Sequence, residues 1–222
     1  MSVVNAYQKQ YQQFQENPEQ FWQEQANRIA WYKKPTNILS VDENEYFRWY
    51  TDGELNTSYL CLDYHVEQGR GEQAALIYDS PVTDTKATYT YRELRDQVAL
   101  FAGGLKSLGV EKGDRVVIYM PMVPEAAIAM LACARLGAIH SVVFGGFAPD
   151  ELAVRIDDAH PKVIVTASCG IEINRVIDYK PMVDEAFKIA EHKPSHVVLL
   201  QRPQSQADMQ AGRDVDWQEL IS

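Results

Sequence analysis

The sequence predicts an α/β fold in which a layered βαβ sheet domain follows a mostly irregular and helical segment rich in aromatic side chains. Two observations lead to this prediction. Residues 1–66 are aromatic and polar with weak hydrophobic periodicity, whereas from Gln73 onward short apolar runs alternate with segments that carry helix signals. That alternation is typical of βα units and a largely parallel sheet. We therefore predict one domain over residues 1–66 and a second over residues 67–222.

The first segment has too little periodic hydrophobicity to close a core of its own. Helices are expected up to about Phe14 and over residues 18–30. The aromatic side chains that follow, Trp31 and Trp49 among them, are large apolar groups that need a surface to cover them. We expect this segment to be a cap that packs its aromatic side chains on a neighbouring domain.

Five short, β-branched runs of the second segment are expected to be strands of the sheet. They are residues 74–78, 115–120, 138–144, 162–166 and 196–200. Each run is bounded by turn residues or by a helical pattern, as βα units require.

The helices between these runs have clear start and stop signals. Thr90 and Glu93 form a capping-box pair, and Gly109 supplies the C-terminal stop of the same helix. The next helix opens at Pro124 and ends before Gly137; it is apolar all round, so we expect it to be buried on several sides. Two further helices are expected, one beginning near Pro149 and one over residues 180–191.

Composition narrows the class of partners. The formal net charge is −10, and a field of that sign repels phosphate backbones, which argues against nucleic-acid binding. No stretch approaches the ~18–20 apolar residues that a membrane span needs, and the N-terminus lacks a signal-peptide pattern. The three cysteines, Cys61, Cys133 and Cys169, have no paired spacing. A reducing, cytoplasmic location is therefore expected, without a membrane.

The first candidate site is the loop Phe144-Gly145-Gly146-Phe147, which lies between a predicted strand and a predicted helix. Ligands of open α/β sheets bind beyond the carboxyl ends of the strands, and two glycines there let a ligand approach the backbone. The alternative is a tight turn that needs glycine for its dihedral angles. The motif by itself leaves both open, and it is not the dinucleotide-binding fingerprint.

The second candidate site is the loop after the run 162–166. It contains Glu172, Ile173, Asn174 and Arg175. Because it follows a strand, Arg175 is well placed to meet an anionic ligand. A surface arginine after a glycine turn is the alternative, and spacing does not decide between them.

No other group of residues indicates catalysis or metal binding. Asp157 and Asp158 are adjacent on a helix and do not share a face, so a solvated or ion-paired role is favoured. His192 and His196 are separated by a proline that breaks the helix between them. His140 is expected to be a hydrogen-bonded histidine in a buried strand. We therefore predict neither catalytic residues nor a metal site.

Longer stretches of sequence resemble a known family. Residues 119–147, YMPMVPEAAIAMLACARLGAIHSVVFGGF, are similar to AMP-forming acetyl-CoA and propionyl-CoA synthetases. Residues 90–94, TYREL, resemble the first core motif of the wider adenylate-forming superfamily. Residues 49–56, WYTDGELN, resemble the N-terminal extension of the short-chain acyl-CoA synthetases. The segments 155–159 and 179–180 look more like the propionate branch than the acetate branch.

This resemblance implies a ligase reaction in two steps. A short-chain carboxylate attacks the α-phosphate of Mg-ATP to give acyl-adenylate and pyrophosphate, and CoA then displaces AMP. The family pattern places the nucleotide end of CoA beside the loops that match Phe144, Gly145 and Gly146 and residues 172–175. Arg175 falls on an arginine of that pattern. Glu172 falls where acetate-type enzymes often carry another arginine, which implies a different mode of CoA binding.

The family's other functional motifs are expected beyond Ser222. They are the phosphate loop, the adenine-binding motif, the acyl pocket, the hinge and the C-terminal lysine, so the ATP and magnesium sites are expected outside these residues. The chain is accordingly interpreted as the N-terminal part of such an enzyme, with an incomplete AMP-binding domain and no ligase activity of its own. The surface left uncovered is expected to be apolar and to favour self-association. A non-catalytic CoA- or nucleotide-binding module and a structural or dimerising domain are the alternatives.

Overall fold

A computed structural model describes residues 5–172 and 175–222 of the protein. The chain forms two compact units, Met1–Asn56 and Thr57–Ser222. The division between the units, after Asn56, therefore lies on the N-terminal side of the boundary predicted between residues 66 and 67. The predicted domain boundary stays a prediction.

The first unit contains two helices, α1 (Ala6–Glu16) and α2 (Pro18–Ala26), and a short antiparallel hairpin of β1 (Leu39–Val41) and β2 (Phe47–Trp49). Its internal contacts are largely aromatic. The rings of Trp22 and Trp49 lie 5.6 Å apart, and the Tyr50 hydroxyl donates to the Trp22 carbonyl at 3.1 Å. Among residues 5–56, the buried hydrophobic side chains are Ala26 and Ile38. The prediction that this segment has little core of its own is thus confirmed.

The second unit is built on a five-stranded sheet whose paired strands are all parallel, in the order β11-β10-β7-β5-β6. Its strands are β5 (Arg115–Met120), β6 (Ile139–Phe144), β7 (Val163–Ala167), β10 (His196–Leu200) and β11 (Asp214–Asp216). Four of these are the predicted runs, whereas β11 was not predicted. The predicted α/β class with a parallel sheet is therefore confirmed.

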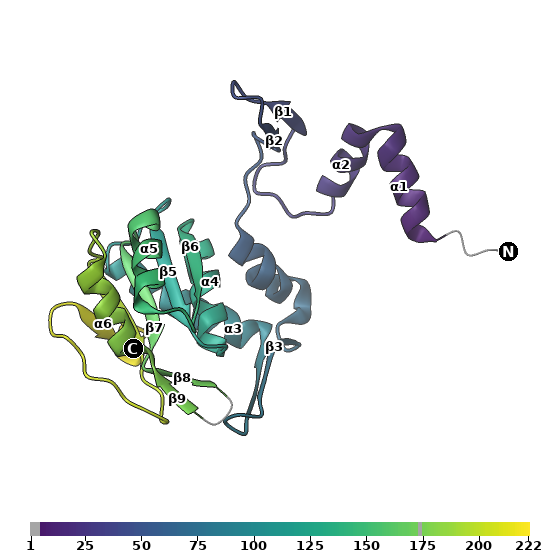
Figure 1. Cartoon of the computed structure of the whole chain (residues 1–222). Helices are drawn as coiled ribbons and strands as arrows, with labels where there is room; N and C mark the ends of the chain where they lie inside the picture. The colour runs from purple at the N-terminus through teal and green to yellow at the C-terminus, as the bar shows by residue number, and fades with distance from the viewer. Residues whose placement is uncertain (1–4, 173–174) are drawn as a thin grey trace. The chain divides into compact units, whose positions relative to one another are not determined.

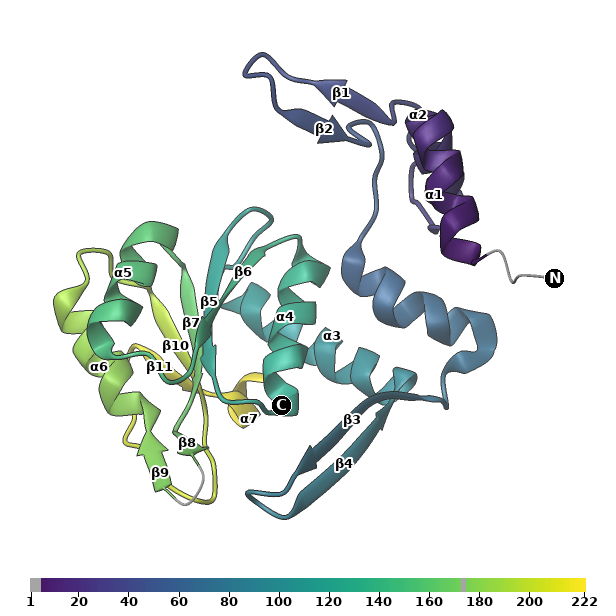
Figure 2. The same ribbon diagram turned by 45° about the vertical axis from the view of Figure 1, so that its right-hand side comes forward.

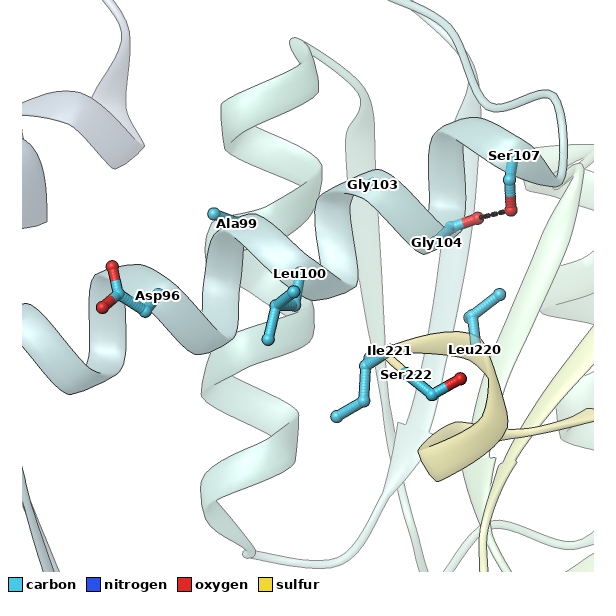
Figure 3. A pocket seen from close by; sticks show the side chains of 9 residues that line it. All are labelled: Asp96, Ala99, Leu100, Gly103, Gly104, Ser107, Leu220, Ile221 and Ser222. Carbon is cyan, nitrogen blue, oxygen red and sulfur yellow. Dashed lines mark hydrogen bonds between the residues drawn. The ribbon is translucent and has the colours of Figure 1, made fainter.

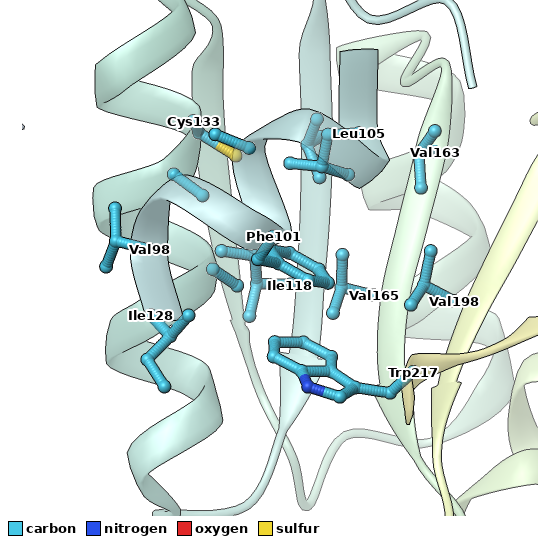
Figure 4. Packing of buried hydrophobic residues seen from close by; sticks show 14 of the residues in the cluster. Val98, Phe101, Leu105, Ile118, Ile128, Cys133, Val163, Val165, Val198 and Trp217 are labelled. Carbon is cyan, nitrogen blue, oxygen red and sulfur yellow. The ribbon is translucent and has the colours of Figure 1, made fainter. Parts of the chain in front are cut away.

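Helices cover both faces of this sheet (Figures 1 and 2). They are α3 (Tyr91–Ser107), α4 (Pro124–Leu136), α5 (Pro149–Ala159), α6 (Tyr179–Ile189) and the short α7 (Trp217–Leu220). Side chains alternate between the faces, since successive strand residues point to opposite sides. Val116 and Ile118 pack with α3 and α4, while Val117 and Tyr119 pack with α5 and α6. Figure 4 shows the first of these two cores.

Local signals predicted the ends of α3 and α4 correctly, whereas α2 ends at Ala26 and not at residue 30. The Thr90 hydroxyl accepts the Glu93 N–H at 3.2 Å, and the Glu93 carboxylate accepts the Thr90 N–H at 2.8 Å, so the capping box is present. Gly109 and Gly137 follow α3 and α4 with positive φ values of 83° and 73°. No residue of α4 is exposed, as expected for a helix without a polar face.

The predicted strand at residues 74–78 is not part of the parallel sheet. It forms β3 (Ala74–Ser80), which pairs in antiparallel register with the unpredicted β4 (Thr85–Thr90). The turn at residues 81–84 brings the chain straight back, so β3 finds a local partner before any crossover helix. Two helical segments, η1 (Tyr59–Asp63) and η2 (Val66–Arg70), precede this hairpin.

The expectation of a buried His140 is wrong. His140 is exposed, because β6 is the edge strand of the sheet and pairs only with β5 among the described strands. The same position exposes apolar side chains of β6: Val142 is 56% and Phe144 70% accessible. The second unit thus carries an uncovered apolar surface along β6.

Candidate functional site

A cavity of about 320 Å³ lies beyond the carboxyl ends of β5 and β6. Met120 and Phe144, the last residues of these two strands, line it together with Gly145 and Gly146. The hairpin of β3 and β4 contributes residues such as Ser80 to another wall. This is the position at which open α/β sheets bind ligands, because the loops after parallel strands converge there.

The two glycines of the loop after β6 are required for close packing. Neither Gly145 nor Gly146 has a positive φ, so the turn does not need glycine for its dihedral angles. A Cβ atom added to Gly145 would lie 2.5 Å from the Tyr179 hydroxyl oxygen, and one added to Gly146 would lie 2.8 Å from the Phe144 ring. The side chains of Tyr179 and Phe144 therefore occupy part of the space beside the glycines that we expected a ligand to fill.

Tyr119 of β5 contacts both this loop and the Tyr179 ring. Its hydroxyl donates to the Phe147 carbonyl at 2.8 Å, and its ring packs against Tyr179 with 5.1 Å between centroids. The side chain is fully buried. Burial, with a smaller contribution from Tyr179, raises the pKa of Tyr119 to about 12, because the phenolate would be poorly solvated there.

Alkaline titration should reveal this buried phenol. Between the ordinary pKa of 10.0 and about 12, Tyr119 keeps its proton in the folded chain and loses it in the unfolded chain. We therefore expect the free energy of unfolding to fall as the pH rises through this window. Tyr119→Phe should remove this part of the pH dependence, whereas Tyr91→Phe should retain it. Urea titrations at several alkaline pH values measure both, and an identical pH dependence in Tyr119→Phe would contradict the assignment.

The predicted loop at residues 169–175 is instead a hairpin of β8 (Cys169–Glu172) and β9 (Arg175–Asp178). Glu172 lines the cavity with Gly146, but Arg175 is not among the lining residues. A terminal nitrogen of Arg175 lies 3.7 Å from a Glu172 carboxylate oxygen, and both side chains are exposed. The predicted residues Ile173 and Asn174 lie outside the described residues.

Two polar side chains of the cavity wall were not predicted as site residues. Tyr179 opens α6, and Arg202 follows β10. Arg202 could have been found from the sequence, since a basic residue two positions after a buried strand lies at the carboxyl edge of a sheet. Tyr179 gave no such signal, because its position under the glycines depends on where α6 packs.

Metal binding finds no support within residues 5–172 and 175–222. No group of three histidine, cysteine or acidic side chains is placed to hold an ion there. His192 contacts the Pro161 carbonyl through Nε2 at 2.8 Å, and its N–H donates to Asp157. In the same residues, no helix is long and apolar enough to cross a membrane.

A larger cavity, of about 640 Å³, lies between α3 and the last residues of the chain (Figure 3). Small and apolar groups of α3, such as Gly103 and Leu100, face Leu220 and Ile221 across it. Among its described lining residues, Asp96 has the one charged side chain. A cavity with this lining offers an anionic substrate no cationic partner, so the smaller cavity at the strand ends is the better candidate site.

The fold has a counterpart among solved structures. The second unit and its preceding segment resemble the acetoacetyl-CoA synthetase of Streptomyces lividans with a TM-score of 0.80 and 24% identity, over 93% of this chain and 31% of that chain. At this level of identity the likeness concerns the fold alone.

Sequence comparison then gives the family. Residues 62–220 match the AMP-binding enzyme family, and residues 7–61 match the N-terminus of acetyl-coenzyme A synthetase. The chain therefore belongs to the AMP-binding enzyme family.

Several curated proteins are similar to the chain over nearly all of its length. An uncharacterised protein of Pseudomonas aeruginosa is 62% identical over 92% of the chain. The human mitochondrial acyl-CoA synthetase short-chain family member 3 is 51% identical over 93%, and acetyl-coenzyme A synthetase of Yersinia pestis is 49% identical over 97%. The chain spans 33%, 30% and 33% of these three proteins, respectively, or about a third of their length.

Proposed function

We propose that the chain is the N-terminal part of an AMP-forming short-chain acyl-CoA synthetase. The observation that carries this proposal is the cavity beyond β5 and β6, which lies at the ligand-binding edge of the sheet in a chain of the AMP-binding family. The reaction joins a carboxylate to ATP as acyl-adenylate with release of pyrophosphate, and CoA then displaces AMP. Its substrates are a short-chain carboxylate, Mg-ATP and CoA.

In this proposal the described residues contribute a wall of the CoA site. Phe144, Gly145 and Gly146 form the rim beside the nucleotide end of CoA, together with residues 172–175. The ion pair between Glu172 and Arg175 partly neutralises the arginine that would otherwise attract a phosphate. The ATP and magnesium sites are proposed to lie outside these residues.

Propionate is the proposed acyl substrate, in preference to acetate. The segments 155–159 and 179–180 support this choice through their resemblance to the propionate branch. The preference concerns a longer form of the protein, since an acyl pocket is expected outside the present residues.

Pyrophosphate exchange tests the proposed activity. The chain of 222 residues should give no exchange between ATP and pyrophosphate with propionate or acetate. A form extended to the length of the relatives should give exchange, with a higher kcat/KM for propionate than for acetate. Exchange by the 222-residue chain would contradict the proposal that the ATP site lies outside these residues. An extended form that binds CoA without exchange would favour a non-catalytic binding module.

Two further expectations belong to this proposal. The uncovered apolar surface along β6 supports self-association of the chain, for which sedimentation velocity over a range of concentrations is the measurement; a strictly monomeric chain would contradict it. A cytoplasmic location is also proposed, from the reducing environment that three unpaired cysteines suit. Fractionation of the source cells would test the location.

A further inference from the structure

Tyr179 places an unpartnered hydroxyl at the wall of the candidate cavity. The residue is 6% accessible, and its hydroxyl oxygen lies between Gly145 and Gly170, 2.5 Å from the Cβ position of each. Within the described residues this hydroxyl makes no hydrogen bond to a protein group, and it is not one of the fully buried side-chain oxygens. A phenolic O–H that faces a cavity can donate to a ligand bound there. The hydroxyl of Tyr179 is therefore available to donate a hydrogen bond to a ligand in the cavity.

Arg202 places an unpaired positive charge at the same wall. It is half-buried, and its terminal nitrogen donates to the Cys169 carbonyl at 3.0 Å. In the described part of the chain, no carboxylate lies within ion-pair distance of its guanidinium, in contrast to Arg175, which has Glu172 beside it. Five N–H donors and a permanent charge leave most of its binding capacity free. A neighbouring cavity of about 310 Å³ is also lined by Arg202, so the group stands where two cavities meet.

We propose that the Tyr179 hydroxyl and the Arg202 guanidinium together bind a phosphate group of CoA in this cavity. This inference rests on the proposed function. It assigns the anion-binding role to Arg202, because Glu172 and Arg175 offset one another. A phenolic O–H and guanidinium N–H groups are both donors, and phosphate oxygens accept several charge-assisted hydrogen bonds at once.

The electrostatics of the cavity agree with this assignment. Among its described lining residues, Glu172 and Arg202 are the ionised side chains, so an anion is attracted to one part of the wall and repelled from the other. Burial and the charge of Glu172 raise the pKa of Tyr179, while Arg202 acts in the opposite direction. The phenol therefore keeps its proton at neutral pH and can donate it to a phosphate oxygen.

Calorimetric titration of the 222-residue chain tests the proposal with CoA, dephospho-CoA and inorganic pyrophosphate as probes. The variants are Tyr179→Phe, which keeps the ring under the glycines, and Arg202→Gln. Tyr91→Phe and Arg92→Gln, both on α3 and outside the cavity lining, are the matched controls. We expect each cavity variant to weaken CoA binding roughly 10-fold, and each control to stay within about 2-fold of the unmodified chain.

Thermal unfolding separates a binding role from a structural one. Tyr179→Phe should unfold at the same temperature as the unmodified chain or at a higher one, because the hydroxyl it removes has no partner among the described residues. Weaker CoA binding together with a lower unfolding temperature would indicate a structural role and would overturn the proposal.

The probes distinguish the phosphate groups of CoA, and they separate a failure of the subsite from a failure of the proposed function. Losses seen with CoA but not with dephospho-CoA assign the subsite to the ribose phosphate, and equal losses assign it to the diphosphate. If CoA binds and both variants bind it normally, the subsite is wrong while the proposed function stands. If pyrophosphate binds with the expected losses but CoA does not bind, the subsite stands and the CoA assignment falls. If the unmodified chain binds neither CoA nor pyrophosphate, the subsite is wrong, and the proposed function is then tested by the exchange assay alone.

Discussion

Replacing Lys180 with methionine is expected to lower the free energy of unfolding by about 3–5 kcal/mol. The ammonium group of Lys180 lies 2.8 Å from both carboxylate oxygens of Asp184 and 2.9 Å from Oδ2 of Asp214. The side chains of Lys180 and Asp214 are 3% and 0% accessible, so water cannot replace a lost cation. Methionine fills a similar volume and therefore removes the charge with little change of packing.

The loss should be large because the charges form one network. Arg213 contacts Asp214 through Nε at 2.6 Å and Asp184 through a terminal nitrogen at 2.5 Å. Without Lys180, Arg213 alone faces the two carboxylates at the junction of α6 and β11. Breaking a buried ion pair from one side leaves an uncompensated charge, which is more costly than never having had the pair.

The pH dependence gives a second readout of the same variant. Burial by itself raises the pKa of Asp214, but hydrogen bonds from Arg213, the Gln210 N–H and Lys180 offset it and hold the pKa below 3.8. This carboxylate therefore stabilises the folded chain above its ordinary pKa, and the stabilisation is lost as the pH falls through the lowered value. The difference between Lys180→Met and the unmodified chain should accordingly narrow under acid conditions.

Lys188→Met is the matched control on the same helix. Its ammonium group lies 2.7 Å from a Glu185 oxygen, but the two side chains are 73% and 48% accessible. Exposed ion pairs contribute little to stability, so the urea midpoint should hardly move. If Lys180→Met changed the midpoint no more than Lys188→Met, the buried network would not stabilise the fold as argued.

The parts of the fold that the sequence predicted are those encoded locally. The capping box of Thr90 and Glu93 and the stop at Gly109 concern residues close together in the chain, so they can be recognised without knowledge of packing. The pairing partner of a strand cannot be recognised in this way. Nothing in residues 74–78 shows that they pair with residues 85–90 in preference to joining the sheet, because both arrangements accept a short apolar run.

The candidate site shows the same limit. Strand-end reasoning located the loop at Gly145 and Gly146, since the position follows from the order of elements. It could not show that Tyr179 fills the space over Gly145, or that Arg175 turns to Glu172, because these contacts depend on the packing of α6 and on a hairpin that the sequence did not reveal.

Phe101→Ala is expected to cost about 3–5 kcal/mol of unfolding free energy, as the removal of a large core side chain leaves a cavity. Phe101 is fully buried and stacks on Trp217 with 3.8 Å between ring centroids and an interplanar angle of 15° (Figure 4). The stack joins α3 to α7, so its loss also loosens the last turn of the described chain. Hydrogen exchange should accordingly rise in α7 and β11 more than in β5.

The neighbouring residue supplies the control for this variant. Leu100 lies next to Phe101 on α3 but is 49% accessible, so Leu100→Ala removes far less buried surface and should cost well under ~1.5 kcal/mol. Phe101→Leu keeps an apolar side chain and should fall between the two. Urea denaturation followed by circular dichroism ranks all three. If Phe101→Ala cost no more than Leu100→Ala, α7 would not be anchored by this stack, and the core on the α3 face of the sheet would have to close without Trp217.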